Sequence, residues 1–233
     1  MSHFLANKQE EAGYRKRKLM KLTIRPARKE DACFLARMIL MAGRAHVKKG
    51  IWEVILKGTE EGCVAFLQIL AISRTPHLFH YSCYFVAEID NKPVASLGGY
   101  DPQVMGYHAL RQAIPEALKK LGLLDEAGNA ADGRSKRILS CLPKDLTGSW
   151  FIDSVATLPE FRRKGIAGKL LEAMLKEGRR RGFARAQINL YIGNVPAQKA
   201  YAKHGFTVLE EKQDQYFEEE IGSPGMLSMV KEL

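Results

Sequence analysis

Three consecutive basic residues and two glycines lie between an apolar segment and an amphipathic one, a combination suited to binding phosphate. Residues 150–157 are rich in aromatic and β-branched side chains, as is typical of a strand, and a helical pattern begins near Gly165. The unpaired N–H groups and positive dipole end of a helix N-terminus can cradle a pyrophosphate, and Gly165 and Gly168 allow close backbone approach. Neither a Walker sequence nor GxGxxG is present. The loop is also compatible with a plain glycine turn into a basic surface helix.

A second segment, residues 188–206, contains regularly spaced residues that complete a recognisable pattern. Together the two segments resemble the GNAT superfamily of acetyl-CoA-dependent N-acetyltransferases. Residues 162–167, RRKGIA, match its acyl-CoA pyrophosphate motif, R/Q-x-x-G-x-G/A. The second motif, N-x-x-A-x-x-x-Y-x-x-x-G-F, is matched by Asn194, Ala197, Tyr201, Gly205 and Phe206. Residues 24–27 and 226–233 resemble the opening and closing strands of the superfamily.

The resemblance implies an acyl-CoA-dependent N-acetyltransferase that uses acetyl-CoA as the acyl donor, without a metal. Loop amides would hold the CoA pyrophosphate, and the end of the preceding strand would pair with the pantetheine arm. The implied CoA-binding residues are Val155, Ala156, Thr157, Arg162, Arg163, Lys164, Gly165, Ile166, Ala167, Gly168, Asn194 and Tyr201. Lys164, Lys169 and Lys203 are candidates for contact with the CoA phosphates, or are solvated surface residues.

Two residues are the catalytic candidates. Tyr201 matches the general acid of the superfamily, since a neutral phenol can protonate a leaving thiolate; a core-packing tyrosine is the alternative. Asp153 lies in an apolar strand, where desolvation would raise its pKa and suit it to take a proton from the amine. It could instead bond nearby backbone or bind the amine, and Glu88 is a second candidate base. Asn194 could bind the pantetheine arm or cap its helix.

Composition restricts the class of protein. The chain has 233 residues, of which 46% are hydrophobic and 27% charged, the balance of a folded globular protein. No apolar run approaches the length of a membrane span, and the N-terminus lacks the apolar core of a secretory signal. Four widely spaced cysteines are expected to be free thiols in a reducing cytoplasm. His77 and His80 lack further ligands for a metal and are expected to be structural or surface residues.

The net charge of +10 is unevenly distributed. Residues 161–185 carry nine basic side chains and two acidic ones, and residues 15–21 form a second basic run. Such runs could bind nucleic acid, but a nucleic-acid binder would more simply be basic along one face with interleaved aromatic residues, and no specific nucleic-acid partner is expected. Residues 210–220 carry six acids and are interpreted as an acidic loop. That loop could attract a cationic acceptor, or be simply solvated.

The elements that must position these residues alternate between strands and helices. Strands are expected at 21–25, 84–89, 94–100, 150–157, 184–191, 206–209 and 226–233, and helices at 29–45, 60–73, 108–121, 165–181 and 195–204. Residues 125–135 are expected to form a loop. The order predicts a single α/β domain. With the resemblance, this becomes a GNAT-like, mostly antiparallel central sheet with helices on both faces, splayed in the middle for acyl-CoA.

The expected organisation is an N-terminal arm over residues 1–20 and an acetyltransferase domain over 21–233. Insertions at about 46–83 and 101–148 exceed what the core of the superfamily needs. We expect transfer to the primary amine of a small molecule by direct attack on the thioester. A protein or peptide acceptor, or an acyl-CoA sensor without turnover, are the alternatives. A homodimer is possible, as is common among relatives; no membrane partner is expected.

Overall fold

The computed structural model describes residues 21–123 and 126–233. The arm predicted over residues 1–20 lies outside the described residues. The strands are β1 Leu22–Pro26, β2 Tyr84–Ile89, β3 Lys92–Tyr100, β4 Ser149–Thr157, β5 Arg185–Tyr191, β6 Thr207–Gln213 and β7 Gly225–Glu232. The helices are α1 Ala32–Arg44, α2 Ile51–Leu56, α3 Glu60–Ala71, α4 Pro102–Met105, α5 Tyr107–Lys120, α6 Glu126–Leu139, α7 Ile166–Arg180, α8 Val195–Lys203 and α9 Gln215–Ile221. Short 3-10 turns are at Lys29–Asp31, Tyr81–Cys83 and Pro159–Phe161.

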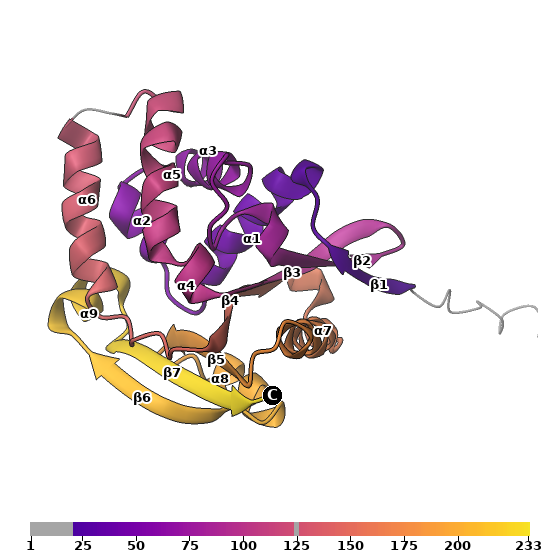
Figure 1. The fold of residues 1–233 in the computed structure, drawn as a ribbon. Helices are drawn as coiled ribbons and strands as arrows, with labels where there is room; N and C mark the ends of the chain where they lie inside the picture. The colour runs from indigo at the N-terminus through magenta and orange to yellow at the C-terminus, as the bar shows by residue number, and fades with distance from the viewer. Residues whose placement is uncertain (1–20, 124–125) are drawn as a thin grey trace, which may run out of the picture.

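The strands form one sheet in the order β1-β2-β3-β4-β5-β7-β6. Neighbouring strands are antiparallel except β4 and β5, which run parallel. A tight turn at Asp90 and Asn91, both with positive φ (49° and 63°), joins β2 to β3 as the sequence predicts. The mixed, mostly antiparallel sheet confirms the predicted fold class. The parallel pair divides it into a four-stranded and a three-stranded part (Figure 1).

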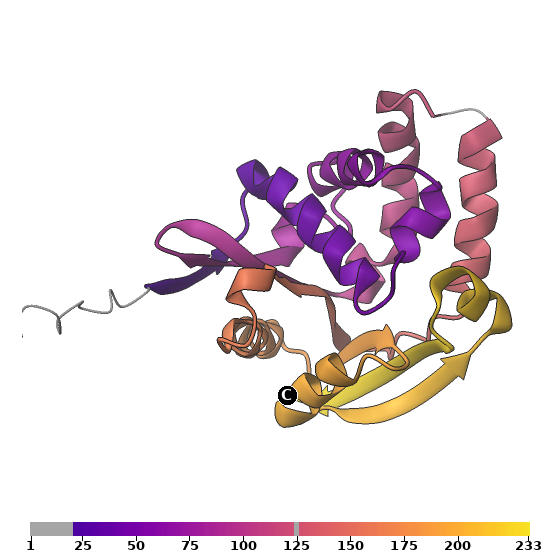
Figure 2. The ribbon, with the colours of Figure 1, turned by 180° about the vertical axis from the view of Figure 1, so that it is seen from behind.

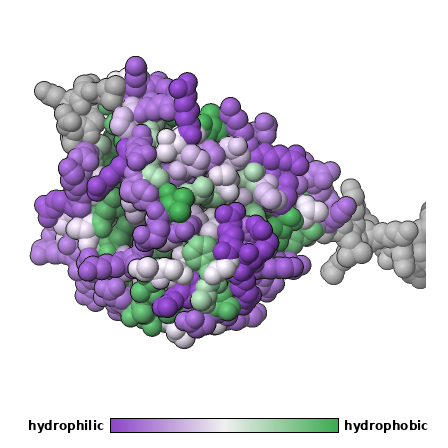
Figure 3. Space-filling model, viewed as in Figure 1, coloured by the Kyte–Doolittle hydropathy of each residue, from purple (hydrophilic) through white to green (hydrophobic). Residues whose placement is uncertain are grey.

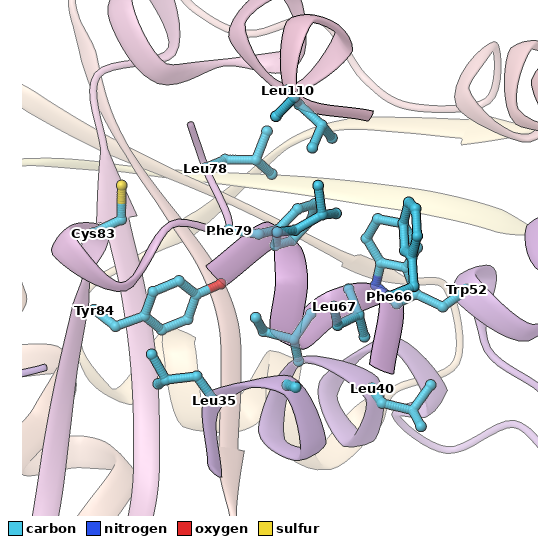
Figure 4. Close-up of a cluster of buried hydrophobic side chains, with 14 of the residues drawn as sticks. Leu35, Leu40, Trp52, Phe66, Leu67, Leu78, Phe79, Cys83, Tyr84 and Leu110 are labelled. Carbon is cyan, nitrogen blue, oxygen red and sulfur yellow. The ribbon is translucent and has the colours of Figure 1, made fainter. Parts of the chain in front are cut away.

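Helices cover both faces of the sheet. In Figures 1 and 2, α1, α3 and α5 lie on one side of the sheet, and α7 lies on the other. The core on the first side includes Trp52, whose ring lies edge-on to Phe79 with centroids 4.9 Å apart. Figure 4 shows this cluster, in which Tyr84 and Leu35 approach from the sheet and α1. A second core packs α7 and α8 against the opposite face of the sheet.

Helix α7 follows from an amphipathic pattern that the sequence shows clearly. Its buried residues are Ile166, Leu170, Leu171, Met174, Leu175 and Gly178, which recur at helical spacing. The helix approaches β3 very closely, since a Cβ on Gly99 would overlap Met174 Sδ. The lack of a side chain at Gly99 therefore fixes how tightly α7 sits on the sheet, and with it the position of the loop that precedes the helix.

Two predicted loops are wrong, because both contain helices. Residues 125–135 were expected to be a loop rich in Gly, Asn and Asp, yet α6 covers most of them. Ala131 and Ile138 pack against Val54 and Ile55 of α2, so burial outweighs the poor helix propensity of this stretch. Residues 210–220 belong to the end of β6 and to α9, where Asp214 caps the helix by accepting from Phe217 N (2.8 Å).

Most of the molecular surface visible in Figure 3 is hydrophilic, with hydrophobic residues in separate small areas. All four cysteines are free; Cys33 is exposed, and Cys63, Cys83 and Cys141 are buried. Among the described residues, no helix combines the length and hydropathy needed to cross a membrane.

Candidate active site

The division of the sheet creates an opening between β4 and β5. Their ladder runs from the Ser149–Arg185 pair to the Ile152–Ile188 pair and ends there. On the other edge of β4, Ala156 pairs with Ser96 and Asp153 with Gly98, so two residues of β4 oppose Leu97 in a bulge. Ser154, in this bulge, has a φ of 50°. A bulge of this kind re-aims side chains and interrupts pairing, here at the point where the two strands separate.

The basic loop leads directly from β4 to the N-terminus of α7. Arg163 and Gly165 both have positive φ, 61° and 75°. Gly165 takes the N-cap position of α7, and its carbonyl accepts from Lys169 N (3.2 Å). The conformation is left-handed at Gly165, which glycine adopts without the steric cost that a side chain brings. The loop thus offers the free N–H groups of a fifteen-residue helix to an anion, as the sequence suggested.

One large cavity joins the loop, the opening between the strands, and the helices on the other side of the sheet. Its volume is about 840 Å³, within the range of small-molecule and cofactor sites. At one end it is lined by the basic loop and α8. It passes Asp153 and Tyr201 and continues between α2, α5 and α6. The cavity therefore has a polar, cationic end and a second end enclosed by helices.

Nearly all of the predicted site residues line this one cavity. They are Asp153, Val155, Ala156, Thr157, Arg162, Arg163, Gly165, Ile166, Ala167, Gly168, Asn194 and Tyr201. The exception is Lys164, whose Nζ lies 4.9 Å from the centre of the Phe161 ring and which is not part of the lining. Of the other lysine candidates, Lys203 lines the cavity and Lys169 does not. Asn194 also caps α8 by accepting from Ala197 N (3.4 Å).

Asp153 is the carboxylate at the centre of the cavity. Its Oδ1 accepts from Ser154 N (2.5 Å), and Ser154 Oγ lies 3.3 Å away. Burial raises the pKa of Asp153 to about 6, partly opposed by these hydrogen bonds, and the nearby charge of Asp145 adds to the increase. Among the described residues, no Lys, Arg or His forms an ion pair with Asp153. This side chain can therefore hold or release a proton near neutral pH.

Tyr201 is 9% exposed and contributes to the cavity wall from α8. Burial raises the pKa of its phenol, and the charge of Asp153 raises it further, so the hydroxyl keeps its proton. Tyr191 on β5 has a different environment. Its hydroxyl donates to Gly43 O (2.6 Å) and accepts from Ile51 N (3.3 Å), which ties β5 to α1 and α2. Tyr201 thus contributes a protonated hydroxyl to the cavity lining, whereas the hydroxyl of Tyr191 is hydrogen-bonded to the backbone of α1 and α2.

Sequence reasoning missed Asp145 and the helical wall. Asp145 precedes β4 and lines the cavity. Desolvation by the surrounding protein atoms raises the pKa of its carboxyl group. Nothing in the sequence distinguishes it from a surface aspartate. The wall from α5 did leave a signal: Tyr107, Leu110, Ile114 and Leu118 line the cavity at spacings of three to four residues, a single stripe of the helix.

Other candidate groups lie away from the cavity. Glu88, the second candidate base, accepts from Arg25 Nη2 (2.7 Å) and is not part of the lining. Arg180 and Arg181 each pair with Glu177 at 2.7 Å, within their own helix. The acidic segment 210–220 is also absent from the lining. Within the described ranges, no three His, Cys, Asp or Glu side chains are grouped so that they could hold a metal.

Comparisons with known proteins identify the family and support the fold. The model of the acetyltransferase (GNAT) family matches residues 65–206, more than half of the chain. A solved structure described as an acetyltransferase shares 21% identity and has a TM-score of 0.64, covering 90% of this chain and 98% of its own. An N-acetyltransferase from Staphylococcus aureus Mu50 shares 19% identity with a TM-score of 0.63, covering 89% and 99%. At these identities the two structures support the fold alone. No curated protein sequence matches significantly.

Proposed function

The chain belongs to the GNAT acetyltransferase family, which transfers acyl groups from acetyl-CoA, and we propose that its acceptor is the primary amine of a small molecule. The observation that carries this proposal is that one cavity joins the basic loop, Asp153, Tyr201 and the wall formed by α5 and α6. The two helices belong to residues 101–148, the expected insertion. Because they form a wall along the end of the cavity away from the basic loop, which we assign as the acceptor end, they favour a small molecule over an extended peptide, which needs an open groove.

The residues of the donor end fit CoA. The N–H groups at the start of α7 and the left-handed turn at Gly165 suit a pyrophosphate. The part of β4 beyond Ile152 is free of β5 and can pair with an extended arm, as a peptide strand would. Thr157 Oγ1 and Asn189 Oδ1, on the two separating strands, are buried and have no hydrogen-bond partner within residues 21–123 and 126–233. Such groups are costly unless something bonds to them, which supports a polar ligand at this place.

Asp153 is proposed to take the proton from the acceptor. An alkylamine is protonated near neutral pH and must lose a proton before its nitrogen can attack. Asp153 is ionised above about pH 6, is not neutralised by a cation in the described part of the chain, and lies where the cavity passes from the donor end to the acceptor end. The same charge attracts the ammonium form, so that binding and deprotonation use one group.

Tyr201 is proposed to protonate the leaving group. Acetyl-CoA supplies a thioester whose carbonyl carbon accepts the amine nitrogen while the C–S bond breaks, releasing CoA. Because the pKa of Tyr201 is raised, its hydroxyl is protonated at neutral pH and can donate to the developing thiolate. A backbone N–H of the interrupted strand β4 could steady the oxyanion.

Release of the CoA thiol tests this proposal. The protein is mixed with acetyl-CoA and a panel of small amines, with a mixture of peptides in parallel. We expect thiol release with at least one small amine, and a kcat about 100-fold lower in Tyr201→Phe, the size of a lost general acid. Tyr216→Phe, which removes the same hydroxyl on α9 outside the cavity, is the matched control. Release with peptides alone would contradict a small-molecule acceptor, and binding of acetyl-CoA without release from any amine would indicate a sensor.

A further inference from the structure

The acceptor end of the cavity is lined largely by apolar side chains. Several large hydrophobic side chains there are neither fully buried nor on the outer surface, because they face the cavity. They are Ile51, Leu56, Tyr107, Ile114, Leu118 and Leu142. Trp52, Phe66 and Phe79, the aromatic cluster seen in Figure 4, are more deeply buried and also contribute to the lining. Water in contact with such a wall is displaced favourably by an apolar group.

The charged side chains that line this end are those of Asp153, Asp145, Asp132, Arg111 and Lys136. Asp153 and Asp145 both line it, and within the described ranges neither forms an ion pair. Asp132 also contributes to the lining, but it is exposed and paired with Lys136 at 2.6 Å. Arg111 and Asp145 are exposed as well, whereas Asp153 is only partly exposed. The least exposed charge of the acceptor end is therefore the unpaired carboxylate of Asp153, which lines the same cavity as the apolar wall.

We propose that the acceptor is a monoamine carried on an apolar body, aromatic or branched aliphatic, which lies between α2 and α5 with its amine at Asp153. This inference rests on the proposed acetyl transfer and specifies its substrate class. The apolar body covers the wall around Leu118 and Ile114, and the ammonium group meets the carboxylates of Asp153 and Asp145. An amino sugar or a polyamine would bring further polar groups against that wall, where each one loses its bonds to water without a replacement.

A long acyl chain on CoA is the competing occupant of the same wall. It would cover the apolar side chains equally well, but it brings no positive charge to Asp153 and Asp145. Covering the partly buried carboxylate of Asp153 with a hydrocarbon chain leaves it without water and without a counter-charge, which is unfavourable. The charge of the site therefore selects the amine over the acyl chain.

Equilibrium binding tests the inference without requiring turnover. The full chain is saturated with desulfo-CoA, which lacks the reactive sulfur, and titrated calorimetrically with 2-phenylethylamine, ethanolamine and butane-1,4-diamine. We expect 2-phenylethylamine to bind at least about tenfold more tightly than the other two, the effect of burying one aromatic side chain. Leu118→Gln should weaken its binding by about tenfold. Val104→Gln, a matched change at a site that is 62% exposed and outside the cavity, should leave it unchanged.

The affinity for desulfo-CoA, measured on both variants, shows that the fold and donor end are intact. Equal or tighter binding of ethanolamine or butane-1,4-diamine would overturn the inference. So would an effect of Leu118→Gln on binding of octanoyl-CoA but not of 2-phenylethylamine, since the wall would then serve the acyl chain. Tight binding of 2-phenylethylamine with no release of thiol from acetyl-CoA would contradict the proposed transfer, whereas release with a preference for ethanolamine would contradict the inference alone.

Discussion

Two groups of carboxylates in this molecule have opposite surroundings. At the β1 edge of the sheet, Arg25 donates to Asp31 (2.7 and 2.9 Å) and to Glu88 (2.7 and 2.9 Å). The Arg25 guanidinium holds the pKa of Asp31 below its ordinary value, and Arg28 N donates to the same carboxylate. At the opening between β4 and β5, burial instead raises the pKa of Asp153, and the neighbouring charge is that of another aspartate.

The difference separates a structural role from a chemical one. A carboxylate that is paired with a cation and accepts backbone hydrogen bonds is stabilised in its ionised form. Protonating it would therefore destabilise the folded protein. A desolvated carboxylate without a counter-charge is costly to the fold and is ready to bind a cation or a proton. Both Glu88 and Asp153 are acids in strands of apolar sequence, and only their three-dimensional surroundings distinguish them.

The largest effect is expected from neutralising Asp153. Asp153→Asn keeps the size of the side chain and the acceptor for Ser154 N but cannot take a proton. We expect kcat/KM for acetyl transfer to fall by about 100-fold or more, the usual contribution of a general base. Glu88→Gln, the same change at the neutralised acid, should leave kcat/KM nearly unchanged. Equal losses in the two variants, measured by thiol release, would remove the distinction between the two sites.

The same variant, Asp153→Asn, should lose no thermal stability although it loses activity. Because the folded-state pKa of Asp153 is raised from 3.8 to about 6, its contribution to stability is present below pH 3.8 and is lost as pH rises through about 6. At pH 7 the folded protein carries an unfavourable buried charge. Asp153→Asn removes it, so the variant should melt no lower than the parent, which also shows that its loss of activity is not unfolding.

A smaller effect, on the free energy of unfolding alone, is expected from removing the ion pair between Arg25 and Asp31. Asp31→Asn leaves Glu88 as the one carboxylate that pairs with Arg25 in the described part of the chain. It should lower the free energy of unfolding by about 2 kcal/mol, a decrease of several degrees in Tm for a domain of this size. The folded-state pKa of Asp31 is lowered, so this stabilisation is present above pH 3.8 and is lost as pH falls through the folded value. Thermal melts at pH 7 and at pH 3 should therefore show a difference that narrows in acid. A large loss of kcat with an unchanged Tm would contradict the structural role.

The sequence was sufficient to predict those parts of the fold that are specified by residues close together in the chain. The strand at residues 150–157, the glycine-containing loop and the amphipathic helix after it are each specified by residues close together, and the structure has them as expected. The β2–β3 hairpin is likewise set by its turn residues. The predicted CoA-binding residues line one cavity, apart from Lys164, and they lie on the two segments, 155–168 and 194–201, that carry the two motifs.

The remaining parts depend on contacts between distant segments. Helix α6 has a sequence typical of a loop, and it is stabilised by packing of Ala131 and Ile138 on α2, more than seventy residues earlier. Asp145 joins the site only because β4 brings it beside Asp153 and the wall from α5. The acidic residues 210–220, whose charge could attract a cationic acceptor, lie outside the cavity lining.

The pH dependence of kcat/KM, measured for the parent and Asp153→Asn, tests the central claim most directly. If Asp153 must be ionised, kcat/KM of the parent should rise about tenfold per pH unit in acid and level off above about pH 6. The variant should lack this transition and stay low throughout. The same transition in the variant, at undiminished activity, would show that another group carries the proton and would contradict the role assigned to Asp153.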